Sequence, residues 1–430
     1  MYGSCFKIVL SYCLISCCNC DGFSGHFDGA DLRLRKEESD VEHFVHTHIF
    51  RERMPHASSR SDIISRSRAE STHIHKVIFV IPQKNMNRLT EILLGVSDPL
   101  SSSYGNHLLR EEVNKLTINQ DSRNAVVSYL LSNGASVVSE SLNGDYITAE
   151  ASIKLWGEIF NTEFYIFHQK GQHGRVEQLV RAEKYWIPKE INEHVEGVLK
   201  VIEIPVITSG SFLKSLPSSK SNSNSINTEA LAIPKITPAI LKKYYNMSSA
   251  TVGSPSSTQA IFASIEQYMS PDDLSFFQTD QNVPVNPISS NVGGHVSSSY
   301  CVSSPQNCAE GNLDIQYIMS VSPLSPTTFW YTDETFSDFL VSVGNTVSPP
   351  LVISISYGQE EDYTTITELN AFKTQSVKLG VMGVTILVAS GDDGANSRTV
   401  RTSGTSMCGY SPSFPASCPF VTAVGATSVR

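Results

Sequence analysis

Three short apolar segments in the last third of the chain constrain its fold most. Residues 351–356, 384–389 and 420–424 each have the length and composition of a buried strand. A segment with helical spacing, residues 364–379, lies between the first two and ends at Gly380. Buried strands that alternate with helices predict a parallel α/β sheet with right-handed crossovers. Functional sites in such sheets lie beyond the carboxyl ends of the strands.

The first half of the chain predicts a second unit with a different order of elements. The expected strands are residues 77–81, 135–140, 146–151 and 163–168, and the expected helices are residues 85–96, 121–131 and 154–160. Asp121 is a candidate helix cap, and Asn133-Gly134 is typical of a helix end. With 163–168 as the closing strand, this order predicts a split βαβ, ferredoxin-like arrangement.

A segment rich in Ser, Asn, Lys and Pro, residues 208–233, separates the two units. Its composition is typical of a flexible linker that proteases can cut. After it, helices are expected over residues 238–245 and through 313–319, and residues 261–269 have amphipathic spacing.

The N-terminus predicts a secretory route. Lys7 and the apolar run 8–15 are typical of a signal peptide, because the run is too short to span a bilayer. Removal of residues 1–20 leaves four cysteines, namely Cys301, Cys308, Cys408 and Cys418. Four cysteines in an oxidising compartment predict two disulfides with three possible pairings. The pairs 301–308 and 408–418 are close enough in sequence for local bridges, and no histidine cluster accompanies them for a metal site.

Composition disfavours two classes of protein. The 430 residues contain 32 Lys+Arg against 42 Asp+Glu, a formal net charge of −10, which argues against a general nucleic-acid binder. No apolar run reaches the roughly 18 residues of a membrane span. Asn246 begins the tripeptide Asn-Met-Ser, a glycosylation sequon that fits secretion.

Three carboxylates are candidates for catalysis. Glu310 and Asp314 are four residues apart in an expected helix, so they share one face and can share a proton. Such a pair suits general acid/base work at low pH, although carboxylate pairs on a solvated helix face are also common. Asp392 follows the strand 384–389, where a protonated carboxyl would hydrogen-bond an oxyanion or, alternatively, cap the next turn.

Ser406 is a candidate nucleophile that we set aside. Gly-Thr-Ser406-Met resembles the nucleophile motif of subtilisins, but a loop-like Cys408-Gly-Tyr-Ser-Pro follows it instead of a helix. A Ser-His-Asp triad also needs a nearby histidine, and the second half of the chain contains only His295. We interpret Ser406 as a surface-loop serine, and a subtilisin-like hydrolase that uses it is our third hypothesis.

Several longer motifs occur in order between residues 72 and 430. They are Pro82-Gln-Lys84, Ser97-Asp-Pro99, Tyr104-Gly-Asn-His107, and the segments 237–246, 310–320, 354–358, 389–392 and 414–427. In this order and spacing they resemble the sedolisins, the serine-carboxyl peptidases, and within them the tripeptidyl-peptidase I type.

The N-terminal features and the resemblance together predict a domain organisation. Residues 1–20 would be a signal peptide, 21–71 a polar lead-in, and 72–205 a ferredoxin-like activation propeptide. Residues 206–233 would be the linker that is cleaved on activation, and 234–430 part of a subtilisin-like parallel-sheet peptidase domain.

The resemblance also implies an activity and residue roles. The expected reaction is hydrolysis of peptide bonds in acid, with release of tripeptides from N-termini, by a Ser-Glu-Asp triad. Glu310 would be the general base, Asp314 would orient it, and a protonated Asp392 would donate to the oxyanion. Five residues are expected to line the substrate cleft, namely Ser356, Tyr357, Gly358, Ser390 and Gly391. Expected partners are peptide and protein substrates and the propeptide as intramolecular inhibitor, in a lysosomal or extracellular location.

Two parts of the family pattern are expected downstream of residues 414–427. They are the nucleophile motif Gly-Thr-Ser-x-x-x-Pro and the calcium site, and the sequence stops at Arg430. We therefore expect the nucleophile and the Ca²⁺ ligands to be missing from these 430 residues, which predicts an inactive, truncated form of a peptidase. The alternative is a catalytically dead protein that binds or inhibits related enzymes. The transcript beyond Arg430 separates the two.

The histidines suggest a hypothesis for activation. Eleven of the twelve precede residue 206. Residues 1–233 hold 24 Lys+Arg and 27 Asp+Glu, so their charge changes from −3 to +8 when all eleven are protonated. We expect this charging, as the pH falls through about 6.5, to loosen the propeptide.

Overall fold

The computed structural model describes residues 47–55, 63–170, 176–205, 208–209, 236–248, 252–395 and 410–427. The expected signal peptide and most of the expected linker lie outside these residues, as do Ser406 and Cys408. We call the described residues up to 205 the N-terminal half and those from 236 the C-terminal half. Within these parts of the chain, no helix is long and apolar enough to cross a membrane.

The C-terminal half is built on a six-stranded parallel sheet with the strand order β12-β13-β11-β14-β16-β18. The strands are β11 (Gln259–Ala263), β12 (Ser290–Val292), β13 (Thr327–Tyr331), β14 (Val352–Ile355), β16 (Thr385–Ala389) and β18 (Thr422–Val424). The three apolar segments of the sequence are β14, β16 and β18. The predicted parallel α/β sheet is therefore confirmed.

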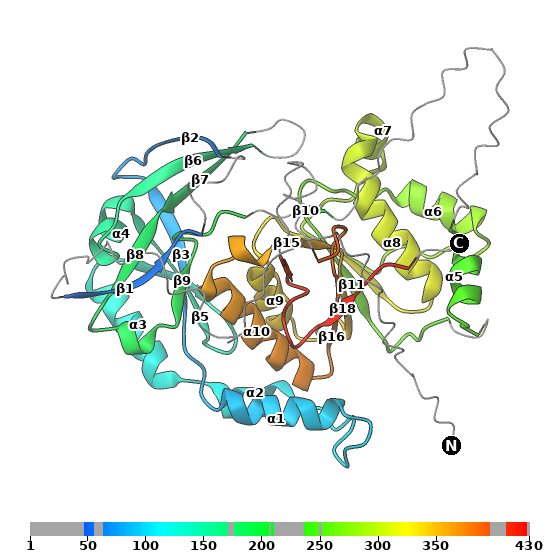
Figure 1. The fold of residues 1–430 in the computed structure, drawn as a ribbon, viewed down its shortest axis with the longest axis horizontal. Helices are drawn as coiled ribbons and strands as arrows, with labels where there is room; N and C mark the ends of the chain where they lie inside the picture. The colour runs from blue at the N-terminus through cyan, green and yellow to red at the C-terminus, as the bar shows by residue number, and fades with distance from the viewer. Residues whose placement is uncertain are drawn as a thin grey trace, which may run out of the picture. The chain divides into compact units, whose positions relative to one another are not determined.

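Helices cover both faces of this sheet (Figure 1). On one face, α6 (Pro271–Asp280) and α8 (Ala309–Val321) share a core with Ile261 and Ala263 of β11. On the other, α9 (Phe336–Gly344) and α10 (Ile366–Val381) share a core with Phe262. Alternate residues of β11 thus point into two different cores, which explains why the whole strand is buried. Two shorter helices are α5 (Pro238–Tyr244) and α7 (Ser298–Ser303).

The sequence did not predict β11. Residues 261–269, which have amphipathic spacing, are not one element, because β11 ends at Ala263 and a loop follows from Ser264. A central strand with apolar neighbours on both faces has no period-2 pattern, so its apolar run merged with the loop residues that follow. The other predicted helices of this half are present as α5, α8 and α10.

The N-terminal half contains a four-stranded antiparallel sheet with the order β4-β5-β3-β9. Its elements are β3 (Ile74–Val80), α1 (Met86–Ser97), α2 (Arg110–Thr117), α3 (Gln120–Ser132), β4 (Ser136–Glu140), β5 (Tyr146–Ser152), α4 (Ile153–Ile159) and β9 (Gly197–Leu199). Strand, helices, two strands, helix and strand in this spatial order make the ferredoxin-like arrangement, as predicted.

The closing strand of this sheet differs from the prediction. Residues 163–168 do form a strand, β6 (Phe164–Lys170), but it pairs with β2 (Ile63–Arg68) and β7 (Val176–Ala182) in a separate sheet. The edge of β3 is taken by β9, a strand of three buried residues. A third, two-stranded sheet joins β1 (His48–Arg53) to β8 (Lys184–Pro188).

One helix cap also differs from the prediction. The side chain of Asn119, not of Asp121, accepts the hydrogen bond from the Ser122 amide at the start of α3. The end of α3 at Asn133-Gly134 is confirmed, and Gly134 has the left-handed φ of 86° typical of a helix end.

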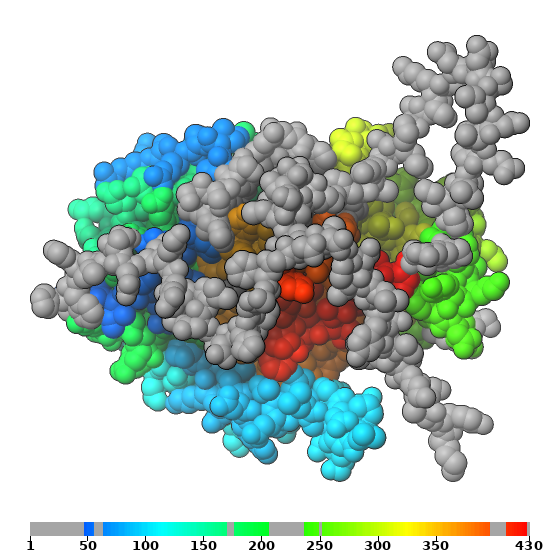
Figure 2. All heavy atoms as spheres, viewed as in Figure 1, coloured from blue at the N-terminus to red at the C-terminus, as the bar shows by residue number. Residues whose placement is uncertain are grey.

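Helix α10 contacts the N-terminal half as well as its own sheet. Val377 and Val381 of α10 form a small core with Leu89 and Leu93 of α1. In Figure 2 the surface of the α1 and α2 segments, in blue and cyan, adjoins the red surface of the last described strands. Contacts on several sides explain why most residues of α10 are buried.

Candidate active site

Helix α8 brings the first two candidate residues together. Glu310 lies in the first turn of the helix and is 3% exposed, and its backbone N–H donates to Gln267 Oε1 at 3.0 Å. Asp314 follows one turn later. Its carboxyl group is hydrogen-bonded to the side chains of Glu310 and Ser356. The i, i+4 spacing seen in the sequence is thus a contact between the two carboxyl groups.

The alternating directions of the side chains along β14 explain why Ser356 contacts Asp314. Ile353 and Ile355 belong to the core under α9 and α10. Ser354 and Ser356 have the opposite parity, so they face the side of the sheet that α8 covers. The sequence Ile-Ser-Ile-Ser therefore puts a hydroxyl next to the carboxyl pair.

A glycine permits the close approach of α8 to the sheet. A Cβ atom on Gly311 would lie 2.3 Å from the backbone oxygen of Tyr268. No real side chain tolerates that distance, so glycine is required between Glu310 and the loop after β11.

The surroundings favour a shared proton on the carboxyl pair. Burial raises the pKa of Asp314 well above its ordinary value, and the nearby Glu310 raises it further, against the hydrogen bond from Ser356. Burial together with the same two carboxylates also raises the pKa of Tyr357, so its phenol stays neutral. A carboxyl pair that holds one proton can accept and return protons in acid.

The structure places the third carboxylate at the same edge of the sheet. Ser390, Gly391 and Asp392 follow β16, which lies beside β14, and all three are exposed. Gly391 has a left-handed φ of 88°, which starts the turn that presents Asp392.

Strand β15 (Tyr357–Glu360) carries the expected cleft residues Tyr357 and Gly358. It pairs antiparallel with β17 (Ser413–Phe414) on one side and with β10 (Thr208–Ser209) on the other. Thr208 lies opposite Gly358, and Ser209 lies opposite Tyr357. The beginning of the expected linker thus adds a strand at this position, as an extended peptide does in β-augmentation. The ring of Tyr357 itself is buried against Phe262, so the strand offers its backbone at this position.

Contacts between the two halves involve charged groups at helix ends. Glu52 of β1 accepts hydrogen bonds from the backbone N–H groups of Ile366 and Thr367, which begin α10. Arg110 of α2 donates to the backbone oxygens of Gly344 and Thr346 at the end of α9. Each charge has the sign that the helix dipole favours.

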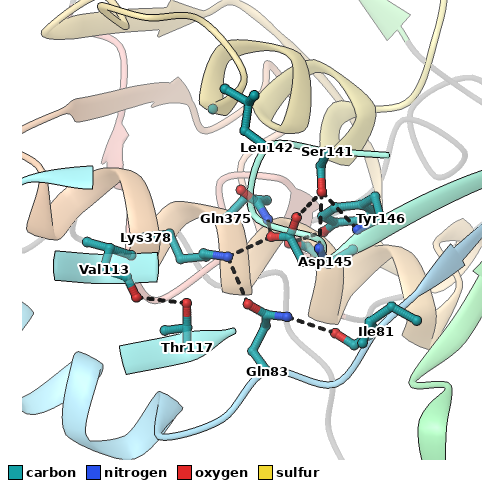
Figure 3. A network of polar contacts seen from close by, with 12 residues as sticks. Ile81, Gln83, Val113, Thr117, Ser141, Leu142, Asp145, Tyr146, Gln375 and Lys378 are labelled. Atoms are coloured by element: carbon teal, nitrogen blue, oxygen red, sulfur yellow. Dashed lines mark hydrogen bonds and ion pairs between the residues drawn. The ribbon is translucent and has the colours of Figure 1, made fainter. Parts of the chain in front are cut away.

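A buried ion pair joins the same two halves (Figure 3). Lys378 Nζ of α10 lies 2.6 Å from Asp145 Oδ2 and 2.9 Å from Gln83 Oε1. Gln375 and Ser141 also donate to the Asp145 carboxylate. The ion pair therefore joins the N-terminal half to α10, on the face of the sheet opposite to α8.

One predicted disulfide is present. Cys301 and Cys308 are bonded, which ties α7 to the start of α8. Cys418 is buried and has no disulfide partner among the described residues, while its candidate partner Cys408 lies outside them. Asn246 is exposed in the turn after α5.

Within the described ranges, no three His, Cys, Asp or Glu side chains lie together as metal ligands. We assign no described residue to calcium.

Sequence reasoning missed three residues around Glu310. Gln267 binds the Glu310 amide, and Tyr331 and Asp333 hold the loop that contains Gln267. Gln267 follows β11, Tyr331 ends β13 and Asp333 follows it, and the sequence predicted neither strand. Recognition of these strands would have pointed to the polar residues at their carboxyl ends.

Comparisons with known proteins agree with the motifs. The family model "Pro-kumamolisin, activation domain" matches residues 61–204. Tripeptidyl-peptidase 1 of Homo sapiens is 29% identical over 380 residues, which cover 85% of this chain and 64% of the relative. Tripeptidyl-peptidase 1 of Dictyostelium discoideum is 29% identical over 387 residues, which cover 81% and 61%. The chain therefore spans less than two thirds of the length of these relatives.

Among solved structures, Pseudomonas sedolisin, a serine-carboxyl proteinase complexed with pseudo-iodotyrostatin, aligns with 44% of this chain. The alignment covers 52% of that protein at 20% identity, with a TM-score of 0.34. By sequence, the chain is therefore similar to tripeptidyl-peptidase 1, and residues 61–204 of its N-terminal half match the activation domain of pro-kumamolisin.

Proposed function

We propose that the protein is the zymogen of an acid-acting serine-carboxyl peptidase that releases tripeptides from the N-termini of peptides. The contact between Glu310, Asp314 and Ser356 at the carboxyl edge of the sheet carries this proposal. The relatives named tripeptidyl-peptidase 1 support the specificity. The proposed location is the lysosome or the extracellular space, which fits the exposed glycosylation sequon at Asn246.

In the proposed mechanism, Glu310 takes the proton of a serine hydroxyl as the oxygen attacks the peptide carbonyl. The serine is expected from the family motif and is not among the described residues. Asp314, which holds its own proton because its pKa is raised, donates a hydrogen bond to Glu310 and keeps it oriented. A protonated Asp392 donates to the oxyanion. Glu310 then returns the proton to the leaving amine, and water cleaves the acyl-enzyme.

The N-terminal half supports an inhibitory role in this scheme. Strand β10 occupies the edge of β15 that a substrate peptide would use. Glu52, Arg110 and Asp145 bind the two helices behind the site. We propose that cleavage in the linker and release of the N-terminal half free this edge for substrate.

The test begins with the transcript beyond the codon for Arg430 and an assay of the encoded protein on peptides with free N-termini at acid pH. Glu310→Gln and Asp314→Asn should each lower kcat by about a hundred- to ten-thousand-fold, because each removes proton transfer. Asp272→Asn, an exposed carboxylate of α6, is the matched control and should leave kcat unchanged. Retention of activity in Glu310→Gln would show that the carboxyl pair is structural.

A further inference from the structure

The loop after β11 has an unusual backbone. Ile265 and Glu266 are consecutive residues with φ of 55° and 54°. L-residues other than glycine rarely adopt this left-handed region, and a β-branched residue such as isoleucine does so at a particular cost. Such a conformation persists only where surrounding contacts hold it, and it is frequent at functional sites.

Two residues at the carboxyl end of β13 supply these contacts. The Ile265 N–H donates to Asp333 Oδ1 at 3.3 Å, and the Glu266 N–H donates to the Tyr331 hydroxyl at 2.9 Å. The Tyr331 hydroxyl in turn donates to Asp333 Oδ1. One phenol and one carboxylate thus satisfy both strained amides.

Tyr331 is itself fixed in place. Its side chain is buried, and its ring stacks on His295 with centroids 3.3 Å apart and planes 11° from parallel. Burial and the bond to Asp333 raise its pKa, so the phenol keeps its proton and can donate and accept at once.

Residues of this loop contact the start of the helix that carries Glu310. Gln267, the next residue, is buried, and its Oε1 accepts the Glu310 N–H at 3.0 Å. The Tyr268 N–H donates to Asn307 O at 2.7 Å, immediately before α8. The first turn of α8, which carries Glu310, therefore rests on residues whose backbone depends on Tyr331 and Asp333.

We propose that Tyr331 and Asp333 are positioning residues for Glu310. They hold Ile265 and Glu266 in the left-handed conformation, and through Gln267 they set the direction in which the Glu310 carboxylate points. Neither residue touches the reacting atoms. This inference rests on the proposed function in one respect, the role of Glu310 as the general base.

The first test removes one hydroxyl. Tyr331→Phe keeps the ring stack and deletes the acceptor of the Glu266 amide. We expect kcat to fall by about ten- to a hundredfold at unchanged KM, because one half-buried amide loses its partner. The matched control is Tyr317→Phe, on α8 itself, whose hydroxyl donates to Ile236 O and does not touch the loop. It should leave kcat unchanged.

A rescue variant separates positioning from general stability. Glycine adopts positive φ without strain, so Glu266→Gly should restore most of the kcat lost in Tyr331→Phe. A loss of stability unrelated to this turn would not be rescued in that way. Wild-type kcat in Tyr331→Phe, or no recovery in the double variant, overturns the proposal.

Amide hydrogen exchange tests the same idea without catalysis. In Tyr331→Phe the Glu310 amide should exchange at least about tenfold faster than in the wild type, because Gln267 no longer holds it in place. If the wild-type protein cleaves no peptide, the proposed function fails while this measurement still decides the positioning. Unchanged exchange at Glu310 overturns the positioning, whatever the activity.

Discussion

The ion pair between Lys378 and Asp145 predicts a large effect from one substitution. The two residues are 1% and 2% exposed, and their charged atoms are 2.6 Å apart. Asp145→Asn keeps the shape of the side chain but leaves a buried ammonium with neutral acceptors alone, the introduced amide and Gln83. Removal of one partner of a buried pair costs about 3–5 kcal/mol. This corresponds to a shift of roughly a hundred- to several-thousandfold in the unfolding equilibrium.

The assay is urea unfolding of the intact zymogen at pH 7, with the free energy taken by linear extrapolation. The double variant Asp145→Asn, Lys378→Met removes the charge as well and should recover at least about 2 kcal/mol of the loss. The pair Lys84–Asp121, 3.2 Å apart with side chains 48% and 87% exposed, is the matched control. Its variant Lys84→Met should change stability by less than about 1 kcal/mol.

A pH series sharpens this prediction. Burial opposes ionisation of Asp145, but Lys378 and the hydrogen bonds from Lys378, Ser141 and Gln375 outweigh it and hold its pKa below the ordinary 3.8. A lowered carboxyl pKa contributes stability above 3.8 and loses it only as the pH falls through the lower folded value. The penalty of Asp145→Asn should therefore be the same at pH 7 and pH 5. A penalty below about 1 kcal/mol at pH 7, or simple additivity in the double variant, would refute the reasoning.

Three further changes test other contacts. Burial lowers the pKa of His75 to about 4, so His75 stabilises the fold above pH 6.5 and loses this effect as the pH falls toward 4. His75→Gln should flatten the fall in unfolding free energy between these values by about 1.4 kcal/mol per pH unit, measured by urea unfolding across the range. Glu52→Ala should lower the free energy of unfolding by about 1–2 kcal/mol, because α10 loses a cap, while exposed Glu70→Ala should not. Replacement of Cys301 and Cys308 by serine should lower it by about 2.5 kcal/mol in the same assay, from the loop-closure entropy of a short loop.

Local sequence patterns predicted the elements that depend on residues close in sequence. The strands around Ile353 and Ile386 were predicted from short apolar runs, and the pair Glu310–Asp314 from its spacing. The disulfide Cys301–Cys308 is local in the same sense.

Other features depend on residues far apart in sequence, and no local pattern encodes them. Glu52 caps a helix that begins more than 300 residues later, and nothing near Glu52 signals that partner. Gly197–Leu199 is a strand only because β3 offers it an edge. Gln267 binds the Glu310 amide only because α8 packs close to the loop after β11, and tertiary packing decides this approach.

Acid has opposite effects on two sets of buried groups, one where the halves meet and one inside the N-terminal half. Burial raises the pKa of Glu203 to about 8 and of Glu368 to about 7, and carboxylates nearby add to the shift in both. The two residues line one small cavity, where the N-terminal half meets α10. A raised carboxyl pKa gives stability that is complete below about 4.5 and is lost as the pH rises through the folded value.

These carboxyl groups therefore hold the halves together more firmly in acid than at neutral pH. Release of the N-terminal half in acid must come from groups with the opposite sign, and His75, whose pKa is lowered, is such a group. Its Nε2–H donates a hydrogen bond to Lys200 O, and the charges of Arg181, His73 and Lys200 oppose its protonation. With His75→Gln in place, the midpoint of acid dissociation should move to lower pH. In Glu203→Gln the midpoint of acid dissociation should stay unchanged. The Glu203 carboxyl group is already protonated in acid, so a neutral amide replaces a neutral carboxyl group. A shift in the second variant and none in the first would assign the acid response to the carboxyl groups instead.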